Sequence, residues 1–571
     1  MFVITQSCCS DAACVAVCPV NCIHPTPEER GFGTSDILHI DPQACIDCGA
    51  CADACPVDAI YPADRLGTRD KVFIDINASY YKDNADVRSG WGPVAGSMPD
   101  TYGVGSVASG PSGYGAGSAA SGPSGHGAGS AASGPSGHGV VYPTIPKLRE
   151  GMRVAVVGTG PSGGYALRTI LDRTQARVTV IDKLPTPGGL VRAGVAPDHP
   201  STKNVMKAFD ILYRDPRVTM VTNVEIGPDV AAGQITPAEL AAHFDAVFYC
   251  VGASESRRLG IAGEDLPGST SATDLVAWYN AVPGAPAPPI RRDGSGRAVI
   301  VGTGNVALDV ARILVSPPEL LSTTDIADRA LRILADQNVH EVVVLGRRGQ
   351  AEAAYTDAEY RALQSIPGVE IVVCDDPSAD VELAAPADPA NRRIVFLFHS
   401  TPTRITGDGV VQQISVTTGE RSHDIAADLV VRSIGYRSVP IDGLPFDAAN
   451  GIFPNERGRL LDDAGTVLPG QYVIGWAKRG PSGGIGTNKL DAITTVEEFL
   501  DDAVAGKVPA PQAPSSVFAA LLKARTSKVI GYRGMRSIDR AERARGARQG
   551  RPRVKFVEVG EMVKAAGRRK R

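Results

Sequence analysis

The 571-residue sequence lacks three features that would place it in a specialised class. It has no apolar run close to the roughly 20 residues that a membrane helix needs. Residues 1–7 carry neither positive charge nor a long apolar stretch, so we expect no secretory signal and a cytoplasmic location. An excess of positive charge is also absent, because 58 Lys and Arg face 62 Asp and Glu. The net charge of −4 argues against nucleic-acid binding through bulk charge.

Cysteine is scarce outside one short segment. Nine of the 11 cysteines lie in the first 55 residues, and only Cys250 and Cys374 lie elsewhere. In a chain without an export signal, this clustering favours metal ligation over disulfide bonds. Because Cys250 and Cys374 are single and far apart, they argue against the redox-active pair of a disulfide reductase.

The segment Cys45-x2-Cys48-x2-Cys51-x3-Cys55-Pro56 has the spacing of a bacterial ferredoxin. Three closely spaced thiolates bind one iron–sulfur cluster, and the fourth, followed by proline, reaches a neighbouring cluster. A zinc site or a disulfide framework is the alternative. Zinc sites usually combine two CxxC pairs at long separation, which this segment does not have.

An earlier segment, Cys8-x2-Asp11-x2-Cys14-x3-Cys18-Pro19, repeats this spacing with Asp at the second position. The two segments together predict two clusters, called cluster I and cluster II. The expected ligands are Cys8, Cys14 and Cys55, with Asp11 at the fourth corner, for cluster I, and Cys18, Cys45, Cys48 and Cys51 for cluster II.

Two forms of cluster I are compatible with these ligands. Three thiolates favour a 3Fe-4S cluster, whereas the Asp11 carboxylate is able to hold a fourth iron and complete a 4Fe-4S cluster. Cys9 is an alternative to Cys8, although the three-residue rhythm favours Cys8. Cys22 fits neither segment and is expected to be a buried free thiol.

Residues 103–139 have a composition that excludes a packed core. The stretches ASGPSGYGAGSA, ASGPSGHGAGSA and ASGPSGHG follow one another with a period of 12. Gly, Ser, Ala and Pro predict a flexible linker, which we place at 77–147. Collagen is excluded because Gly does not recur at every third position.

Beyond residue 151, apolar β-branched runs alternate with glycine turns and helical stretches, which predicts an α/β fold with parallel strands. The expected strands are 153–157, 178–181, 246–251, 298–301, 341–345 and 429–434.

Charge is unevenly distributed along the chain. Residues 1–76 carry 11 acidic and four basic side chains, whereas residues 523–571 carry 17 basic and four acidic ones. The basic segment shows weak helical periodicity over 537–545. It is expected to be a solvated or partner-binding extension, or alternatively a docking surface for the acidic segment.

The first of two dinucleotide-binding patterns follows the strand at 153–157. Gly158, Gly160 and Gly163 form GxGxxG, where a tight turn and a helix N-terminus accommodate a pyrophosphate. Nineteen residues after Gly163 the next strand ends in Asp182. Its carboxylate is suited to accept the hydroxyls of an adenosine ribose, so this site is expected to bind FAD or NAD.

The second pattern, Gly302-x-Gly304-x2-Ala307, also follows a buried strand, and alanine at its third position still permits close packing. The strand after it is followed by Arg347 and Arg348. Arginine matches a 2′-phosphate, so this site is expected to bind NADP. The interval from the turn to Arg347 is about twice the usual ~20 residues, and a solvated charge pair is the alternative.

Four longer stretches carry a resemblance to a known family. They are LPTPGGLVRAGVAPDHP (184–200), GTGNVALDVARIL (302–314), GRRG (346–349) and GWAKRGPSG (475–483). On these stretches, residues 151–498 resemble the adrenodoxin-reductase-type ferredoxin–NADP+ reductases. With the cysteine-rich segment included, the whole chain is similar to the fused ferredoxin/ferredoxin–NADP+ reductases.

The resemblance implies an α/β protein with two Rossmann-like domains, the NADP domain inserted in the FAD domain, and a small α+β ferredoxin-like N-terminal domain. The implied boundaries are 1–76 for the two-cluster ferredoxin domain, 77–147 for the linker, 148–253 and 429–522 for the FAD domain, 254–428 for the NADP domain and 523–571 for a basic C-terminal extension.

Cofactor contacts of the family carry over to matching positions. FAD contacts are expected at Gly158, Gly160, Ser162, Gly163, Asp182, Leu190, Val224, Trp476, Gly483, Gly484 and Ile485. NADP contacts are expected at Thr303, Gly304, Asn305, Val306, Arg347, Arg348, Glu359 and Gly483. His199 is a candidate for proton handling or a structural loop residue. Trp476 is expected to cover the flavin ring, with core packing as the alternative.

The implied activity is electron transfer between NADPH and the iron–sulfur clusters through FAD, in either direction. No side-chain acid, base or nucleophile is required, because the cofactors supply the chemistry. The implied partner is an external ferredoxin or another one-electron acceptor such as a cytochrome P450 system. A glutamate-synthase-type small subunit combines the same cofactors and is the alternative, which the stretches PDHP and GWAKRGP disfavour.

Overall fold

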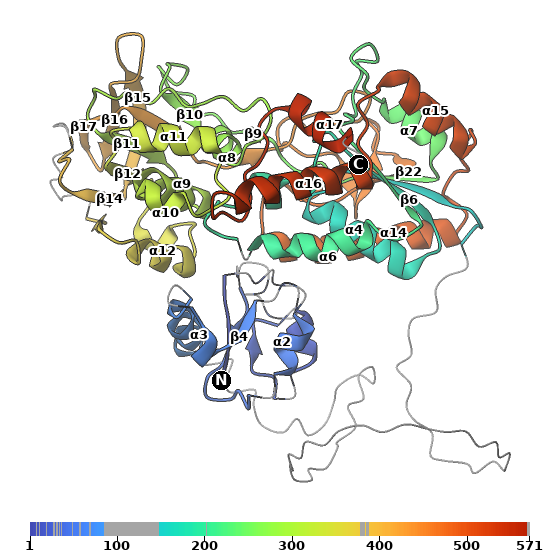
Figure 1. Cartoon of the computed structure of the whole chain (residues 1–571), viewed down its shortest axis with the longest axis horizontal. Coiled ribbons are helices and arrows are strands. Elements are labelled where there is room, and N and C mark those ends of the chain that lie inside the picture. The colour runs from blue at the N-terminus through green and yellow to red at the C-terminus, as the bar shows by residue number, and fades with distance from the viewer. Residues whose placement is uncertain are drawn as a thin grey trace.

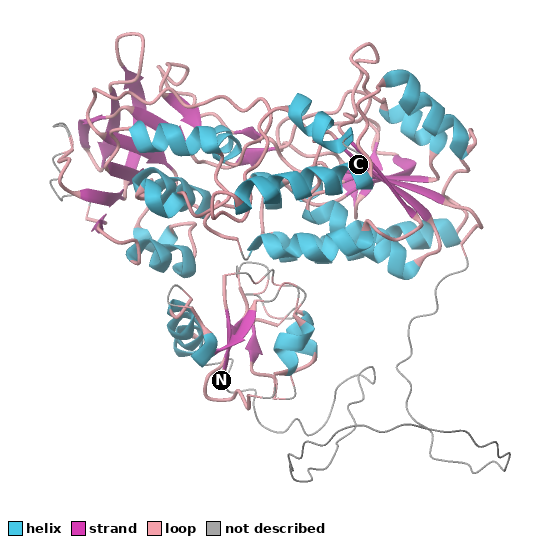
Figure 2. Cartoon of the chain, viewed as in Figure 1, coloured by secondary structure: helices cyan, strands magenta, loops and turns pink. Residues whose placement is uncertain are grey.

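The computed structural model describes residues 1–84 and 148–567, which form two lobes side by side and a smaller unit beneath them (Figures 1 and 2). The repeats at 103–139 lie outside the described residues. Among the described residues, every helix is too short or too polar to cross a membrane. Within residues 1–84 and 148–567, the structure does not describe positions 7, 9, 11, 19, 27, 28, 30, 31, 33, 34, 36, 48, 56, 58, 68, 69, 201, 377–382 and 384–386.

Residues 1–84, called the head below, combine two short antiparallel sheets with three helices. The elements are β1 (Phe2–Ile4), α1 (Ala13–Ala16), β2 (Ile23–His24), β3 (His39–Ile40), α2 (Ala50–Ala54), β4 (Ile60–Pro62) and α3 (Val72–Asp83). Asn77 of α3 is buried, and its side-chain oxygen accepts the backbone N–H groups of Ile4 (3.2 Å) and Ile40 (2.8 Å). Asn77 of α3 thus connects the two sheets. The folded head therefore continues past residue 76, where the domain was expected to end.

The first lobe is built on a seven-stranded sheet ordered β20-β21-β22-β8-β5-β6-β7, in which the strands from β22 to β7 run parallel. Its strands are β5 (Arg153–Val157), β6 (Arg177–Asp182), β7 (Val218–Thr222), β8 (Ala246–Tyr249), β20 (Asn455–Glu456), β21 (Arg459–Leu461) and β22 (Val467–Val473). Its helices are α4 (Pro161–Arg173), α5 (Leu190–Ala193), α6 (Val205–Leu212), α7 (Pro237–His243), α13 (Trp476–Arg479) and α14 (Ile485–Val504). Helices α4, α6 and α14 lie together along one side of the lobe (Figure 1).

The second lobe is built on a six-stranded parallel sheet ordered β10-β18-β11-β12-β14-β13, beside a three-stranded antiparallel sheet β15-β16-β17. Its strands are β10 (Ser269–Ser271), β11 (Arg297–Val301), β12 (Glu341–Leu345), β13 (Val369–Cys374), β14 (Arg392–Leu397), β15 (Ser400–Thr406), β16 (Gln413–Thr418), β17 (Arg421–Ala426) and β18 (Leu429–Arg432). Its helices are α8 (Ala272–Tyr279), α9 (Asn305–Val315), α10 (Pro318–Leu321), α11 (Asp328–Asp336) and α12 (Asp357–Gln364).

The chain passes between the lobes at two places that lie side by side. There β9 (Glu255–Ser256) pairs antiparallel with β19 (Tyr436–Arg437). The second sheet is therefore formed by residues that lie between the two parts of the first. All six expected strands are present and parallel, because their apolar residues are buried within these two sheets. The prediction of an α/β fold is confirmed.

The C-terminal basic segment differs from the expected extension. It folds into α15 (Ser515–Arg525, which begins before it), α16 (Tyr532–Ala547) and α17 (Val559–Gly567), which pack on the lobes (Figure 1). Thr222 of β7 and Ile530 exchange backbone hydrogen bonds of 3.0 Å. Two basic residues of the segment, Arg551 and Lys555, are buried. The expectation of a solvated extension is wrong because these charges pair with acids far away in the sequence.

Candidate functional site

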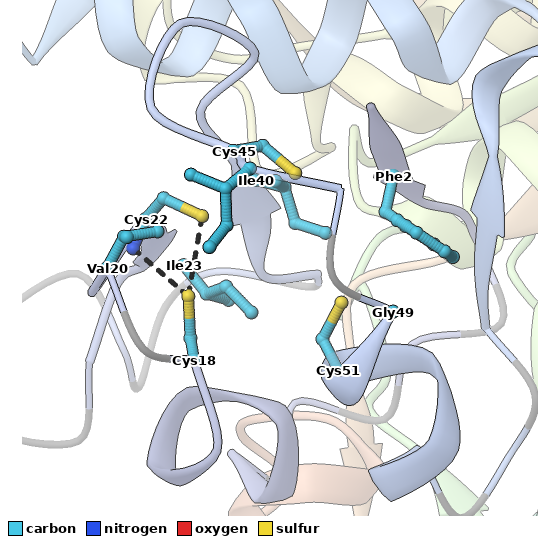
Figure 3. A pocket seen from close by; sticks show the side chains of 10 residues that line it. Phe2, Cys18, Val20, Cys22, Ile23, Ile40, Cys45, Gly49 and Cys51 are labelled. Atoms are coloured by element: carbon cyan, nitrogen blue, oxygen red, sulfur yellow. Dashed lines mark hydrogen bonds between the residues drawn. The ribbon is translucent and has the colours of Figure 1, made fainter. Parts of the chain in front are cut away.

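Three of the four predicted cluster II ligands meet in one pocket of the head. Cys18, Cys45 and Cys51 line it together, and their sulfur atoms are visible around the pocket in Figure 3. The fourth, Cys48, lies outside the described residues. The remaining lining is apolar apart from one further cysteine and consists of Phe2, Val20, Cys22, Ile23, Ile40, Ile46 and Gly49. A pocket of thiols with an apolar wall fits an iron–sulfur cluster.

Cys22 was not expected at this pocket. It is buried as predicted, but its Sγ lies 3.4 Å from Sγ of Cys18, and its backbone N–H donates to the same sulfur at 3.4 Å. The hydrogen bond from Cys22 lowers the pKa of Cys18 to about 6, which favours the thiolate form that binds iron. The same contact raises the pKa of Cys22. The only sequence signal was the spacing Cys18-x3-Cys22, which belongs to no ligand run.

The three predicted cysteine ligands of cluster I are all in the described part of the head. Cys14 is buried, whereas Cys8 and Cys55 are half-buried. The sulfur of Cys8 accepts the backbone N–H of Leu38 at 3.4 Å, and that of Cys55 accepts the N–H of Ala59 at 3.3 Å. Backbone donors of this kind stabilise a thiolate. Asp11 and Cys9 lie outside the described residues, so the fourth corner stays a prediction.

The first glycine pattern forms the turn between β5 and α4. A Cβ on Gly163 would lie 1.9 Å from the carbonyl oxygen of Gly158, so no larger residue fits. Gly158 has a φ of +98° and packs against the carbonyl of Cys250. The strand, turn and helix are thus arranged as the sequence predicted. Cys250 is buried, and burial raises the pKa of its thiol, which is contrary to the needs of a disulfide reductase.

Asp182 at the end of β6 braces this turn. Its carboxylate accepts the backbone N–H of Thr159 at 2.9 Å, the Thr159 hydroxyl, and the N–H of Leu184 at 2.9 Å. Burial outweighs these bonds and raises the pKa of Asp182. The structure therefore gives Asp182 a supporting role in the turn, and its contact with a ribose stays a prediction.

The other predicted FAD contacts gather around the N-termini of α4 and α14. The Ser162 hydroxyl donates to the Asn488 side chain of α14 at 3.0 Å. The Trp476 indole donates to the carbonyl of Gly483 at 3.2 Å. A Cβ on Gly484 would meet nothing within 4 Å, so the start of α14 faces open space that is suited to a ligand. Leu190 begins α5 in the 184–200 segment, and Val224 is buried after β7.

The second glycine pattern forms the turn between β11 and α9. Gly302 has a φ of +118°, and a Cβ there would lie 2.2 Å from the carbonyl oxygen of Ser433. Thr303, Gly304, Asn305 and Val306 surround the N-terminus of α9, and Gly304 faces open space. The interval to the arginines is long because α10 and α11 follow α9 before β12 begins.

Arg347 and Arg348 directly follow β12, and both are exposed. The preceding Gly346 lies against the turn, since a Cβ there would be 3.0 Å from the Thr303 side chain. Arg347 and Arg348 thus lie at the same edge of the sheet as the glycine turn. This position suits a phosphate on the adenosine of a nucleotide whose pyrophosphate lies at α9.

A buried charge network joins the 184–200 segment to the second lobe. The Arg312 guanidinium of α9 donates to Asp198 at 2.7 Å, to Glu359 of α12 at 3.3 Å, and to Asp309. His199 Nδ1 lies 3.7 Å from Asp309 and 4.0 Å from Glu359. Burial and Arg312 lower the pKa of His199, so the neutral imidazole is favoured. Predicted site residues from both lobes are brought together here.

The head contacts this network directly. The Gln6 side chain donates to Glu359 at 2.5 Å, and its backbone carbonyl accepts the Thr202 hydroxyl at 3.4 Å. Helix α3 lies against α12, where Arg361 donates to the Ser79 hydroxyl at 3.4 Å. Gln6 is two residues from Cys8, so the part of the head that precedes this cysteine faces the lobes. Sequence reasoning gave no signal for these contacts.

Comparison with known proteins identifies both parts of the chain. Residues 7–59 match the 4Fe-4S dicluster domain family, and residues 152–366 match the pyridine nucleotide-disulphide oxidoreductase family. A probable ferredoxin/ferredoxin–NADP reductase of Mycobacterium tuberculosis is 42% identical, covering 99% of this chain and 94% of that protein. A counterpart from Mycobacterium leprae is 40% identical, covering 99% of this chain and 98% of that protein.

A solved structure supports the same assignment for the two lobes. Mycobacterium tuberculosis FprA in complex with NADPH superposes with a TM-score of 0.66 at 38% identity, covering 73% of this chain and all of that one. The resemblance found in the sequence and the predicted enzyme class are confirmed. The chain therefore belongs to the fused ferredoxin/ferredoxin–NADP reductases: it is an FAD- and NADP-binding oxidoreductase with a dicluster ferredoxin domain that carries out NADPH-dependent electron transfer.

Proposed function

We propose that the first lobe binds FAD and the second lobe binds NADPH, so that an NADP domain is inserted in an FAD domain. The proposed boundaries are 148–253 and 429–522 for FAD and 254–428 for NADP. The pairing of β9 with β19, where the chain passes between the lobes, supports this division. The two-cluster ferredoxin domain precedes both, with residues 77–147 containing the connection.

The proposed FAD site lies between the N-termini of α4 and α14. The pyrophosphate is held at the glycine turn by backbone N–H groups and the helix dipole of α4. The proposed contacts are Gly158, Gly160, Ser162, Gly163, Asp182, Leu190, Val224, Trp476, Gly483, Gly484 and Ile485. Trp476 is proposed to lie against the flavin ring, where its indole is already fixed by Gly483 and by a Tyr436 ring 5.3 Å away. His199 is proposed to hold a proton beside this site.

The proposed NADPH site runs from Arg347 and Arg348 past the second glycine turn to Glu359. The arginines hold the 2′-phosphate and the N-terminus of α9 holds the pyrophosphate. The proposed contacts are Thr303, Gly304, Asn305, Val306, Arg347, Arg348, Glu359 and Gly483. Gly483 is shared with FAD, which places the two cofactors next to one another at α14.

The proposed cluster II ligands are Cys18, Cys45, Cys48 and Cys51, which together bind a 4Fe-4S cluster. The meeting of three of them in one pocket supports this set. The proposed cluster I ligands are Cys8, Cys14 and Cys55, with a 3Fe-4S cluster, or a 4Fe-4S cluster if Asp11 completes it. We propose a cytoplasmic location because these ligands must stay reduced.

The single observation that carries the electron route is the contact of Gln6 with Glu359 and Thr202. Because Gln6 lies two residues before Cys8, this contact supports a route in which cluster I is the cluster nearer to the cofactor sites. FAD held at the first glycine turn would supply the chemistry that links the hydride of NADPH to single-electron transfer to the clusters. Ile46, next to Cys45, is 59% exposed, and it offers an apolar contact for an external ferredoxin or another one-electron acceptor such as a cytochrome P450 system.

The test is NADPH-driven reduction of an external ferredoxin or cytochrome c by the purified protein alone. A reductase is expected to turn over without any partner subunit. A glutamate-synthase-type small subunit would reduce its own cofactors but would need its larger partner for the onward transfer. Failure of NADPH to bleach the flavin at all would refute the proposed assignment of the two lobes.

A further inference from the structure

Residues 551–556, called the strap below, run from the end of α16 along the seam between the lobes. The Arg551 side chain is 3% exposed, and the hydrogen bonds of its guanidinium reach the second lobe apart from a weak one to Gln549. Its guanidinium donates to the carbonyl of Thr324 at 2.9 Å, to Asp328 at 2.5 Å, and to the carbonyl of Ile326. One end of the strap is thus fixed on the residues that lead into α11.

The strap is also fixed to the first lobe through Glu542 of α16. This carboxylate is fully buried and accepts Arg192 of α5 at 2.7 Å, Arg553 at 3.0 Å and the backbone N–H of Phe556 at 3.1 Å. Burial alone would raise the pKa of Glu542, but the two arginines lower it. Gly546 permits the close approach, since a Cβ there would lie 2.5 Å from Cα of Arg553.

Lys555 joins the strap to both lobes at one point. Its side chain is 1% exposed, and its Nζ lies 3.1 Å from Asp325 and 3.0 Å from the Asn280 side-chain oxygen of the second lobe. Asp325 also accepts Lys203 of the first lobe at 2.7 Å. The amide of Asn280 donates to the carbonyl of Val195 at 3.2 Å, within the 184–200 segment.

These contacts hold the lobes at one separation. Buried ion pairs resist rearrangement, because leaving one partner uncompensated costs several kcal/mol. A second buried contact between the lobes lies at another position of the 184–200 segment, where Asp198 pairs with Arg312. Two buried contacts between this segment and the second lobe, at Val195 and at Asp198, restrict hinge motion between the lobes more strongly than either contact alone. Hydride transfer depends steeply on such separation, since a misplacement of 1 Å costs about 100-fold in rate.

We infer that Arg551 and Lys555 are positioning residues that set the distance between the FAD and NADPH lobes for hydride transfer. The inference rests on the proposed assignment of the cofactors to the two lobes. Neither residue belongs to the proposed cofactor contacts, so their effect is on the rate of transfer and not on nucleotide affinity.

The test is anaerobic stopped-flow reduction of the flavin by NADPH in the full-length holoprotein carrying Lys555→Met. Methionine keeps the length of the side chain, and Asp325 keeps its pairing with Lys203. The rate of flavin reduction at saturating NADPH is expected to fall about tenfold or more, with the Kd for NADPH changed less than about threefold. Amide exchange at 324–328 is expected to be faster, and Lys555→Arg should recover most of the rate.

Arg543→Ala is the matched control, because Arg543 lies on the exposed side of α16 and its ion pair, among the residues that the structure describes, is with Asp539 of the same helix. It should leave the rate unchanged. If Lys555→Met does not fold, Asp328→Asn removes one partly exposed partner of Arg551 and should slow reduction about two- to fivefold. Faster exchange at 324–328 with an unchanged rate would overturn the inference. A parent protein that NADPH does not bleach would instead refute the proposed function.

Discussion

At the scale of single residues, we expect Arg347 and Arg348 to set the preference for NADPH over NADH. Each charge-assisted contact with a phosphate contributes roughly 1.5–3 kcal/mol, about 10- to 150-fold in affinity. The double variant Arg347→Ala with Arg348→Ala is therefore expected to raise the KM for NADPH strongly and the KM for NADH little, measured with ferricyanide as acceptor. Arg404→Ala, an exposed arginine of β15 in the same lobe, should change neither value. Equal kinetics of the parent protein with both nucleotides would remove the basis for this assignment.

Asp11 is the residue that we expect to set the form of cluster I. Asp11→Cys restores a fourth thiolate and is expected to give a stable 4Fe-4S cluster where the parent protein has a three-iron or mixed site. Iron and sulfide analysis with EPR of the isolated protein measures the change. Two all-cysteine 4Fe-4S clusters in the parent protein would show that Cys9 or Cys22 is recruited instead, and the ligand pairing would be wrong.

The cysteine ligands that the sequence identified share one property, which is that local spacing defines them. Cys18, Cys45 and Cys51 were found because ferredoxin ligands recur at fixed intervals, and the pocket brings them together. The contact of Cys22 with Cys18 and that of Glu542 with Arg192 were not predicted, because only the folded chain brings these side chains together. Glu542 pairs with Arg192, 350 residues away.

At the scale of elements, the seam between the lobes is expected to be acid-sensitive. Burial would raise the pKa of Asp325, but Lys555 and Lys203 lower it to about 2, below the ~3.9 of an unfolded chain. Its contribution to stability is therefore present above about pH 4 and is lost as the pH falls through about 2.

Asp325→Asn tests this contribution. Leaving Lys203 and Lys555 without their shared acid is expected to lower the free energy of unfolding by about 3–5 kcal/mol at pH 7, and the difference from the parent should shrink toward pH 3. Denaturant unfolding at several pH values measures it, with the exposed Asp293→Asn of the same lobe as a neutral control. A difference that stays constant from pH 7 to pH 3 would contradict the lowered pKa.

Strands and glycine turns were predictable because their signals are local. The turns before α4 and α9 require glycine where a Cβ would meet backbone atoms, and apolar runs mark β5 and β11. The C-terminal segment was not predictable in the same way. Arg551 looks solvated in the sequence because its acidic partner Asp328 lies 223 residues away.

At the scale of the whole molecule, the head lies against both lobes, through Gln6 and Thr202 of the first lobe and through Glu359 and Arg361 of the second. The alternative that the basic C-terminal segment docks the acidic head is not supported. Arg551 and Lys555 of that segment are engaged in ion pairs with the second lobe, and Arg553 pairs with Glu542 of the same segment. The composition predicted two oppositely charged segments. It could not predict what each segment contacts, because the contacts of the head and of the C-terminal segment with the lobes depend on the complete fold.

The central claim is that electrons from NADPH reach the clusters within one molecule. The most direct test is anaerobic mixing of the holoprotein with less than one equivalent of NADPH, following flavin absorbance and rapid-freeze EPR of the clusters together. We expect flavin bleaching first and then cluster signals, which grow at a rate independent of protein concentration. Flavin that bleaches without any cluster signal, or cluster reduction that accelerates in proportion to protein concentration, would contradict the account.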